Sequence, residues 1–146
     1  MIDANLLADD VRGKVLYIED NPVNFAVVET CLTRLPNVQL LHAVNGREGV
    51  RMVLSECPDF VLLDMHLGDM SGLDVVRQIS RDIAERHLRV TILTGDGFSM
   101  DVIKAMSLGA FEYWVKPVDP DLLVAGVRRA LSGMMADPAY TLGHPM

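Results

Sequence analysis

Five polar residues of this sequence each stand at the end of a short apolar run that is typical of a β-strand. They are Glu19, Asp20, Asp64, Thr94 and Lys116. The carboxyl ends of neighbouring parallel strands open into one crevice, so these side chains would lie close together if the runs form one sheet. Three carboxylates packed together repel one another unless a cation neutralises them, and Mg²⁺ prefers oxygen ligands. The pattern therefore predicts a magnesium site built from Glu19, Asp20 and Asp64.

Asp64, Thr94 and Lys116 supply the groups that phosphoryl transfer to an aspartate requires. A carboxylate beside Mg²⁺ can attack phosphorus in line, which makes Asp64 the predicted nucleophile. Mg²⁺ and Lys116 would offset charge on the equatorial phosphoryl oxygens, and the hydroxyl of Thr94 would hydrogen-bond to one of them. The expected product is an acyl phosphate on Asp64.

Five strand-and-helix units along the chain would have to position these residues. The strands are expected at 14–18, 39–43, 60–63, 90–93 and 111–115. Each is followed by a segment with one apolar stripe at helical spacing. In the third unit one continuous helix is expected, with the stripe Leu73, Val76, Ile79 and Ile83. Such alternation predicts an α/β three-layer sandwich, with five helices on the two faces of a five-stranded parallel sheet. The periodicity does not give the strand order.

The length of 146 residues suits a single domain. The repeating pattern covers residues 14–133, which we predict to be that domain. Residues 1–13 would be an N-terminal extension, in which Leu6 and Leu7 could form a short helix. Residues 134–146 would be a C-terminal tail.

Composition and charge argue against several classes of function. Thirteen basic against twenty acidic residues give a net charge of −7, so no nucleic-acid partner is expected. No apolar run is long enough to span a membrane, and the acidic start of the chain does not resemble a secretory signal, which predicts a cytoplasmic location. Cys31 and Cys57 have no partner at metal-ligand spacing and are expected to be small buried side chains. His42 has no recognisable partner and is expected to be solvated.

Four segments together resemble the response-regulator receiver family of two-component signalling. They are KVLYIEDNPVN, VLLDMHLGDMSGLD, TILTG and YWVKP. Each is weak alone, but in this order and at these spacings they are highly specific, and the resemblance covers about residues 14–133. It implies a phosphorelay protein in which Asp64 accepts a phosphoryl group from a histidine kinase or a His-phosphotransfer protein. Such a protein is a signalling switch that catalyses its own phosphorylation and slow dephosphorylation, and is not a conventional enzyme.

The resemblance also implies a set of metal ligands. Asp20 and Asp64 would bind Mg²⁺ directly, and Glu19 would act through a metal-bound water. The main-chain carbonyl of His66 would be a further ligand, while its imidazole would lie at the rim of the site. Mn²⁺ can replace Mg²⁺ in such a set of oxygen ligands.

The same resemblance implies the arrangement of the sheet and the moving parts. The strand order would be the flavodoxin-like 2-1-3-4-5, and the peptide bond before Pro117 would be cis. Thr94 would move toward the phosphate, and Tyr113 would turn inward. The signal would leave by contact with a downstream protein that the sequence does not name.

Two positions in the loop after Asp64 depart from the commonest family pattern. Gly68 stands where proline is usual, and Ser71 stands where aspartate is common. Neither is a phosphate ligand, so these departures concern the stiffness of the loop more than the chemistry.

Three other functions fit the sequence less well than the receiver does. A haloacid-dehalogenase-like phosphatase also uses an aspartyl phosphate, but its nucleophile belongs on the first strand, and a second aspartate belongs where His66 stands. A flavodoxin-like nucleotide or flavin binder would want a phosphate-binding loop after the first strand, where EDNPVN would repel phosphate. A docking-only pseudo-receiver would not need the intact set of Glu19, Asp20, Asp64, Thr94 and Lys116.

Overall fold

The computed structural model of the protein describes residues 11–95 and 97–134. Within these residues, five strands alternate with six helices. The strands are β1 (Arg12–Ile18), β2 (Asn37–Ala43), β3 (Phe60–Asp64), β4 (Arg89–Thr94) and β5 (Glu112–Val115). The helices are α2 (Pro22–Leu32), α3 (Gly46–Glu56), α4 (Gly72–Gln78), α5 (Ser80–Arg86), α6 (Met100–Ser107) and α7 (Pro120–Met134). All five predicted strands are present.

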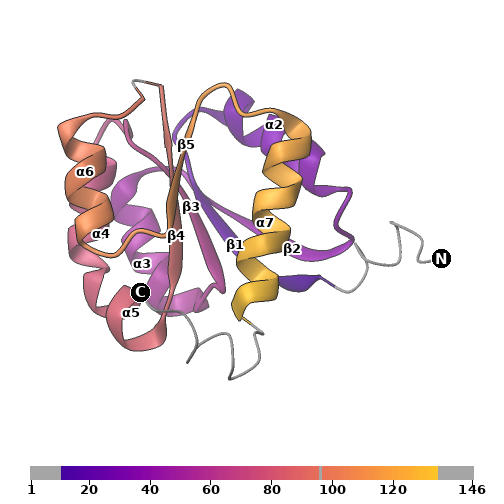
Figure 1. Ribbon diagram of the computed structural model, residues 1–146, viewed down its shortest axis with the longest axis horizontal. Helices are drawn as coiled ribbons and strands as arrows, with labels where there is room; N and C mark the ends of the chain where they lie inside the picture. The colour runs from indigo at the N-terminus through magenta and orange to yellow at the C-terminus, as the bar shows by residue number, and fades with distance from the viewer. Residues whose placement is uncertain (1–10, 96, 135–146) are drawn as a thin grey trace.

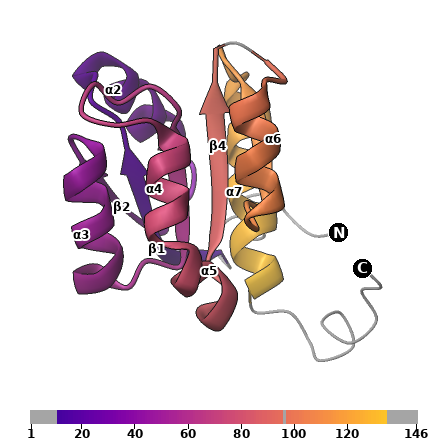
Figure 2. The same ribbon diagram turned by 90° about the vertical axis from the view of Figure 1, so that its left-hand side faces the viewer.

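The five strands form one parallel sheet in the order β2-β1-β3-β4-β5, the order that the family resemblance implies. Helices α2 and α7 cover one face, and α3 to α6 cover the other (Figures 1 and 2). The fold is therefore the predicted α/β three-layer sandwich. A parallel sheet covered on both faces needs fully buried central strands, and every residue of β3 is buried.

Side chains along each strand alternate between two apolar cores. In β1, Ile18 faces the core under α3 to α6, whereas Tyr17 faces the core under α2 and α7. In β5, Tyr113 and Trp114 divide in the same way. The polar side chains that could form a site therefore stand at the ends of the strands, outside the two cores.

The third unit differs from the expectation of one helix, because two short helices follow β3. Helix α4 ends at Gln78 and α5 begins at Ser80, because the residue between them, Ile79, has a ψ of 13° that departs from helical geometry. The predicted stripe is nevertheless buried, because the Ile83 N–H donates to the Ile79 carbonyl (3.1 Å) and keeps the helical direction. The predicted count of five helices is therefore wrong, and the predicted apolar face is confirmed.

Both ends of the chain lie outside the described residues. The short helix expected at Leu6 and Leu7 therefore stays a prediction, as does the division into extension, domain and tail. Cys31 is buried, but Cys57 is exposed where the chain leaves α3, so the expected burial of Cys57 is wrong. No helix in the described part of the chain has the length and apolar character to cross a bilayer.

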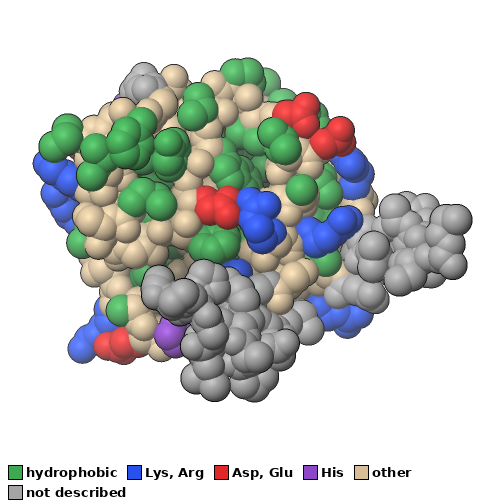
Figure 3. Space-filling view, in the orientation of Figure 1, with side chains coloured by type: hydrophobic (Ala, Val, Ile, Leu, Met, Phe, Trp, Pro, Cys, Tyr) green, Lys and Arg blue, Asp and Glu red, His purple; other side chains and the backbone are tan. Residues whose placement is uncertain are grey.

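Large apolar side chains are exposed on the side of the molecule formed by α6, β5 and α7. They are Phe98, Met100, Ile103, Leu108, Val115 and Leu122. Figure 3 views this side and shows hydrophobic side chains gathered over α6. Apolar side chains gathered on one exposed face are typical of a surface that binds other proteins.

A tight contact between α7 and β5 gives a prediction about stability. Gly126 is buried, and a Cβ atom there would overlap the ring of Trp114. Alanine would gain about 1 kcal/mol of helix propensity, but overpacking costs about 1–3 kcal/mol, so we expect Gly126→Ala to lower the free energy of unfolding. Chemical denaturation would measure this, with exposed Ser132→Ala as the control that stays near the wild type. A Gly126→Ala protein more stable than the wild type would contradict the contact.

Candidate functional site

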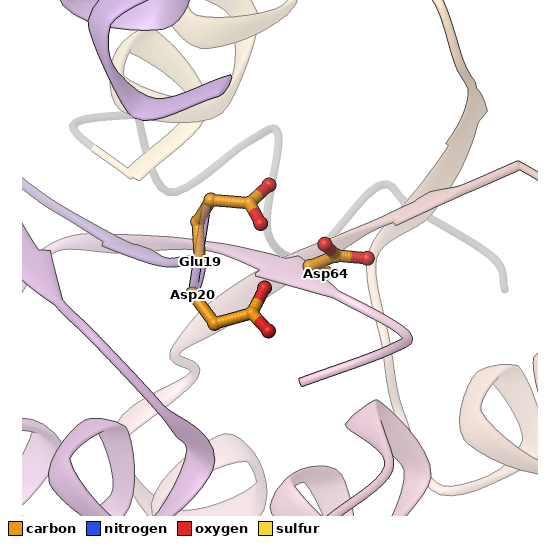
Figure 4. A group of neighbouring side chains, drawn as sticks. All are labelled: Glu19, Asp20 and Asp64. Carbon is orange, nitrogen blue, oxygen red and sulfur yellow. The ribbon is translucent and has the colours of Figure 1, made fainter. Parts of the chain in front are cut away.

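The three predicted metal ligands converge at the carboxyl edge of the sheet. Glu19 and Asp20 follow β1, and Asp64 ends the adjacent strand β3. One carboxylate oxygen from each lies within 4.8 Å of the others, and Figure 4 shows the three side chains pointing toward one another. Glu19 is fully buried and Asp64 is 5% exposed, whereas Asp20 is exposed. This edge, between β1 and β3, is the point where the strand order reverses.

Lys116 reaches the same cluster from the end of β5. Its Nζ atom lies 3.0 Å from Asp64 Oδ2 and 3.5 Å from Glu19 Oε1. The Lys116–Pro117 peptide bond is cis, as expected. One ammonium group cannot balance three carboxylates, so the cluster retains the negative charge and the oxygen ligands that a divalent cation requires.

Glu19 is held by two hydrogen bonds in addition to Lys116. The Tyr17 hydroxyl donates to Oε1 (2.9 Å), and the Asn21 N–H donates to Oε2 (3.2 Å). Burial raises the pKa of Glu19 and so does the nearby Asp64, while the two hydrogen bonds oppose this rise. Burial and the adjacent Glu19 carboxylate also raise the pKa of Tyr17. The carboxylate of Glu19 is thus fixed in position, but the nearby ammonium group of Lys116 does not balance the negative charge of the cluster.

Tyr17 is not among the predicted site residues, and His42 has partners that the sequence did not indicate. Tyr17 stands two residues before Glu19, so the alternation of β1 could have placed both side chains on one face. His42 Nε2 lies 2.7 Å from the Glu19 carbonyl oxygen, and its ring stacks on Phe25 with centroids 3.9 Å apart. The expectation that His42 is solvated is therefore wrong. The register of β1 and β2 causes this contact, because His42 pairs with Tyr17.

Thr94 and His66 lie around one pocket beside the carboxylate cluster. Thr94 ends β4 and is 1% exposed, and its carbonyl accepts from the Lys116 N–H (2.8 Å). The His66 side chain is exposed, while its N–H donates to Asp64 Oδ1 (3.1 Å). A pocket of about 300 Å³ is lined by both residues and by the start of α6. The exposed residue His66 thus lines this pocket, and the place of its imidazole at the rim of the metal site stays a prediction.

Tyr113 lies on the same side of the sheet as this pocket. Its ring is partly buried against the core under α3 to α6, and its centroid is 5.7 Å from that of Phe98. Phe98 is 65% exposed and precedes α6. Tyr113 is therefore in contact with the loop that follows Thr94.

Ser71, one of the two departures in the loop after Asp64, has a structural role. Its hydroxyl accepts from the Asp74 N–H (3.1 Å), and its own N–H donates to the Asp74 carboxylate (3.3 Å). This reciprocal pair is a capping box at the start of α4. Serine therefore replaces aspartate here without loss of the helix cap.

A doubly wound parallel sheet with three carboxylates and a lysine at its switch point defines a class of α/β domain with a site for a divalent cation and an anion. Residues 15–128, which are most of the chain, match the response regulator receiver domain. The protein therefore belongs to the response regulator receiver family.

Individual relatives agree with this assignment. The chain is 29% identical to PilH of Pseudomonas aeruginosa over 83% of this chain and 99% of PilH. It is 31% identical to the response regulator MtrA of Mycolicibacterium smegmatis over 92% of this chain but only 57% of MtrA. The crystal structure of a receiver domain protein from Clostridium thermocellum, 32% identical, superposes with a TM-score of 0.74 and covers 84% of this chain and 96% of that protein. The chain thus spans nearly all of PilH and little more than half of MtrA.

Proposed function

We propose that this protein is a phosphorelay switch in which a histidine kinase or a His-phosphotransfer protein transfers a phosphoryl group to Asp64. The observation that carries the proposal is the environment of Asp64. Its carboxylate lies within 4.8 Å of two other carboxylates, its Oδ2 atom is 3.0 Å from an ammonium group, and it ends the central strand at the switch point. Membership of the receiver family sets aside the phosphatase and flavin-binding alternatives and leaves the docking-only receiver as the alternative to test.

The oxygen donors of these residues fit Mg²⁺. Glu19, Asp20 and Asp64 would hold the ion with the carbonyl of His66, and Mn²⁺ would serve in its place. When bound, the ion would supply positive charge to the phosphoryl oxygens. The acidic cluster by itself offers only oxygen ligands, which is the preference of these ions.

The protein's own side chains would carry the transfer. A carboxylate oxygen of Asp64 forms the new bond to phosphorus as the bond from phosphorus to the donor histidine nitrogen breaks, and the imidazole leaves. Lys116 offsets the charge of the transferred group, and the Thr94 hydroxyl donates to one of its oxygens. Asp64 thereby becomes an acyl phosphate.

A downstream protein would recognise the phosphorylated state at the exposed apolar side chains on the side formed by α6, β5 and α7. Thr94 precedes the loop to Phe98, and Phe98 contacts Tyr113, so a shift of Thr94 toward the phosphate changes the packing of both rings. The neighbouring exposed side chains of α6, β5 and α7 offer the contact surface for a downstream protein.

The proposal is tested by phosphotransfer from a radiolabelled, phosphorylated His-phosphotransfer protein. We expect label to move to this chain only when Mg²⁺ is present, and the bond to be labile to hydroxylamine, as an acyl phosphate is. No transfer, together with intact folding, would favour the docking-only receiver. Label that resists hydroxylamine would contradict an aspartyl phosphate.

The contact between Tyr17 and Glu19 gives a prediction about metal affinity. Tyr17→Phe removes one donor from a buried carboxylate, so the pKa of Glu19 rises further and protons compete better with the metal. We expect Mg²⁺ affinity at neutral pH to fall by about fivefold to tenfold and the pH midpoint of binding to move upward. Calorimetric titration with Mg²⁺ measures both. The matched control is Tyr113→Phe, which should bind Mg²⁺ as the wild type does; unchanged affinity in Tyr17→Phe would contradict the role of the hydroxyl.

A further inference from the structure

The loop between β3 and α4 is attached to the start of α3 through the side chain of Asp69. Asp69 Oδ1 accepts from the Gly46 N–H and Oδ2 accepts from the Arg47 N–H, both at 2.9 Å. The first amides of a helix have no partner within the helix and carry partial positive charge, so a carboxylate is a favourable ligand for them. Asp69 therefore acts as a clamp between two segments that are more than twenty residues apart.

The clamp is separate from the helix's own N-cap. Asn45 Oδ1 accepts from the Glu48 N–H (2.8 Å), which caps α3 from within its own segment. Burial acts to raise the pKa of Asp69, but backbone hydrogen bonds from Arg47 and Gly46, together with those of Asp69 and Met70, outweigh it and lower the pKa, so the carboxylate stays charged. Removal of either cap weakens α3, but of these two caps Asp69 is the one that connects α3 to the loop.

The same loop forms one wall of the carboxylate cluster. The His66 N–H donates to Asp64 Oδ1 (3.1 Å), and the Gly72 N–H donates to the Met65 carbonyl (2.8 Å), which closes the base of the loop. Gly68 has a φ of +76°, and a Cβ atom there would lie 3.4 Å from Asp20 Oδ2. The backbone thus passes directly beside Asp20, one residue before Asp69.

Apolar packing supports the same attachment. A Cβ atom on Gly46 would overlap the side chain of Met70, so the first residue of α3 lies directly against the loop. Gly68 allows the backbone its positive φ but adds no stiffness of its own, because glycine is the most flexible residue. The loop is therefore held at its base by the Gly72 hydrogen bond, and at its tip by the clamp at Asp69 and the packing of Met70.

We propose that Asp69 is a positioning residue, whose clamp on the first amides of α3 holds the β3–α4 loop in the shape that the metal site beside Asp20 and Asp64 requires. The proposal rests on the function proposed above, because it assumes that these carboxylates bind Mg²⁺. A group that orients the surroundings of a metal ligand commonly changes metal affinity by about 10–100-fold when it is removed. Asp69 does not contact a metal ligand and acts through the loop backbone, so we expect a change in Mg²⁺ affinity at the lower end of that range.

The test compares Asp69→Asn with Asn45→Ala, which removes the other cap of the same helix. Thermal denaturation reports the structural effect, and calorimetric titration with Mg²⁺ reports the positioning effect. We expect both variants to lower Tm, and only Asp69→Asn to weaken Mg²⁺ binding, by about tenfold. If Asp69→Asn fails to fold, Asp69→Glu replaces it, because it keeps the charge at the helix but moves the loop away by one methylene, and it too should bind Mg²⁺ more weakly.

The outcomes separate the clamp from the proposed function. A wild-type affinity in the Asp69 variant, or an equal loss of affinity in Asn45→Ala, would overturn the positioning role and leave Asp69 as a helix cap alone. Absence of Mg²⁺ binding in the wild type would overturn both proposals. The clamp is supported if the wild type binds Mg²⁺ and is phosphorylated, and if Mg²⁺ binding is weakened in the Asp69 variant but not in Asn45→Ala.

Discussion

Replacement of Asp20 by asparagine is expected to remove Mg²⁺ binding and, at the same time, to raise the melting temperature of the metal-free protein. Lys116 pairs with Glu19 and Asp64, so among the ion pairs of the described residues none neutralises Asp20. Its charge lies within 4.8 Å of two other carboxylates and repels them. Loss of a direct ligand should weaken Mg²⁺ binding by more than about a hundredfold, since even supporting residues cost 10–100-fold.

The two readouts for Asp20→Asn are Mg²⁺ calorimetry and thermal denaturation without metal. Asp121→Asn is the matched control, because it makes the same change at an exposed carboxylate that pairs with Arg34 instead. The control should bind Mg²⁺ normally and gain no stability. Wild-type Mg²⁺ affinity in Asp20→Asn would show that this carboxylate is not a ligand, and a lower melting temperature would show that the cluster is not strained by its charge.

Replacement of Lys116 by glutamine should lower the stability of the metal-free protein, whereas Asp20→Asn should raise it. Its main effect should be on the rate at which Asp64 is phosphorylated. The variant leaves the buried Glu19 and Asp64 without their cation, which costs about 1–2 kcal/mol of metal-free stability, less than for a fully buried pair because Lys116 is 28% exposed. Mg²⁺ should bind at least as tightly, since the ammonium no longer competes for Asp64. Loss of a preorganised donor to the transferred group should slow phosphorylation by about a hundredfold to a thousandfold.

The rate of phosphorylation by acetyl phosphate at saturating Mg²⁺ measures this effect. Lys104→Gln provides the control, because Lys104 is an exposed lysine of α6 that lies outside the site. It should be phosphorylated at the wild-type rate. A Lys116→Gln protein that is phosphorylated as fast as the control would remove Lys116 from the proposed transfer.

Much of the fold follows from local patterns in the sequence. Apolar runs give the strands, and stripes at helical spacing give the buried faces of the helices, because burial imposes both periods. The break at Ile79 does not interrupt the stripe, which is why one helix was expected where α4 and α5 lie. The strand order required the family resemblance, because periodicity along one strand carries no information about its neighbours.

Part of the site could also be predicted from the sequence, and part could not. The proximity of Glu19, Asp20 and Asp64 was predictable, because the carboxyl ends of neighbouring parallel strands share one edge of the sheet. The contact of His42 with Glu19 depends on the register of β1 against β2, and the clamp of Asp69 depends on how a loop meets a distant helix. Such contacts arise from tertiary packing, which the spacing of residue types does not encode.

The central claim, that Asp64 carries the phosphoryl group, is tested most directly by intact mass spectrometry after incubation with Mg²⁺ and acetyl phosphate, with Asp64→Asn alongside. We predict one phosphoryl adduct on the wild type that requires Mg²⁺ and is absent from the variant. An adduct of the same yield on Asp64→Asn, or none on a folded wild type that also fails to bind beryllium fluoride, would contradict it.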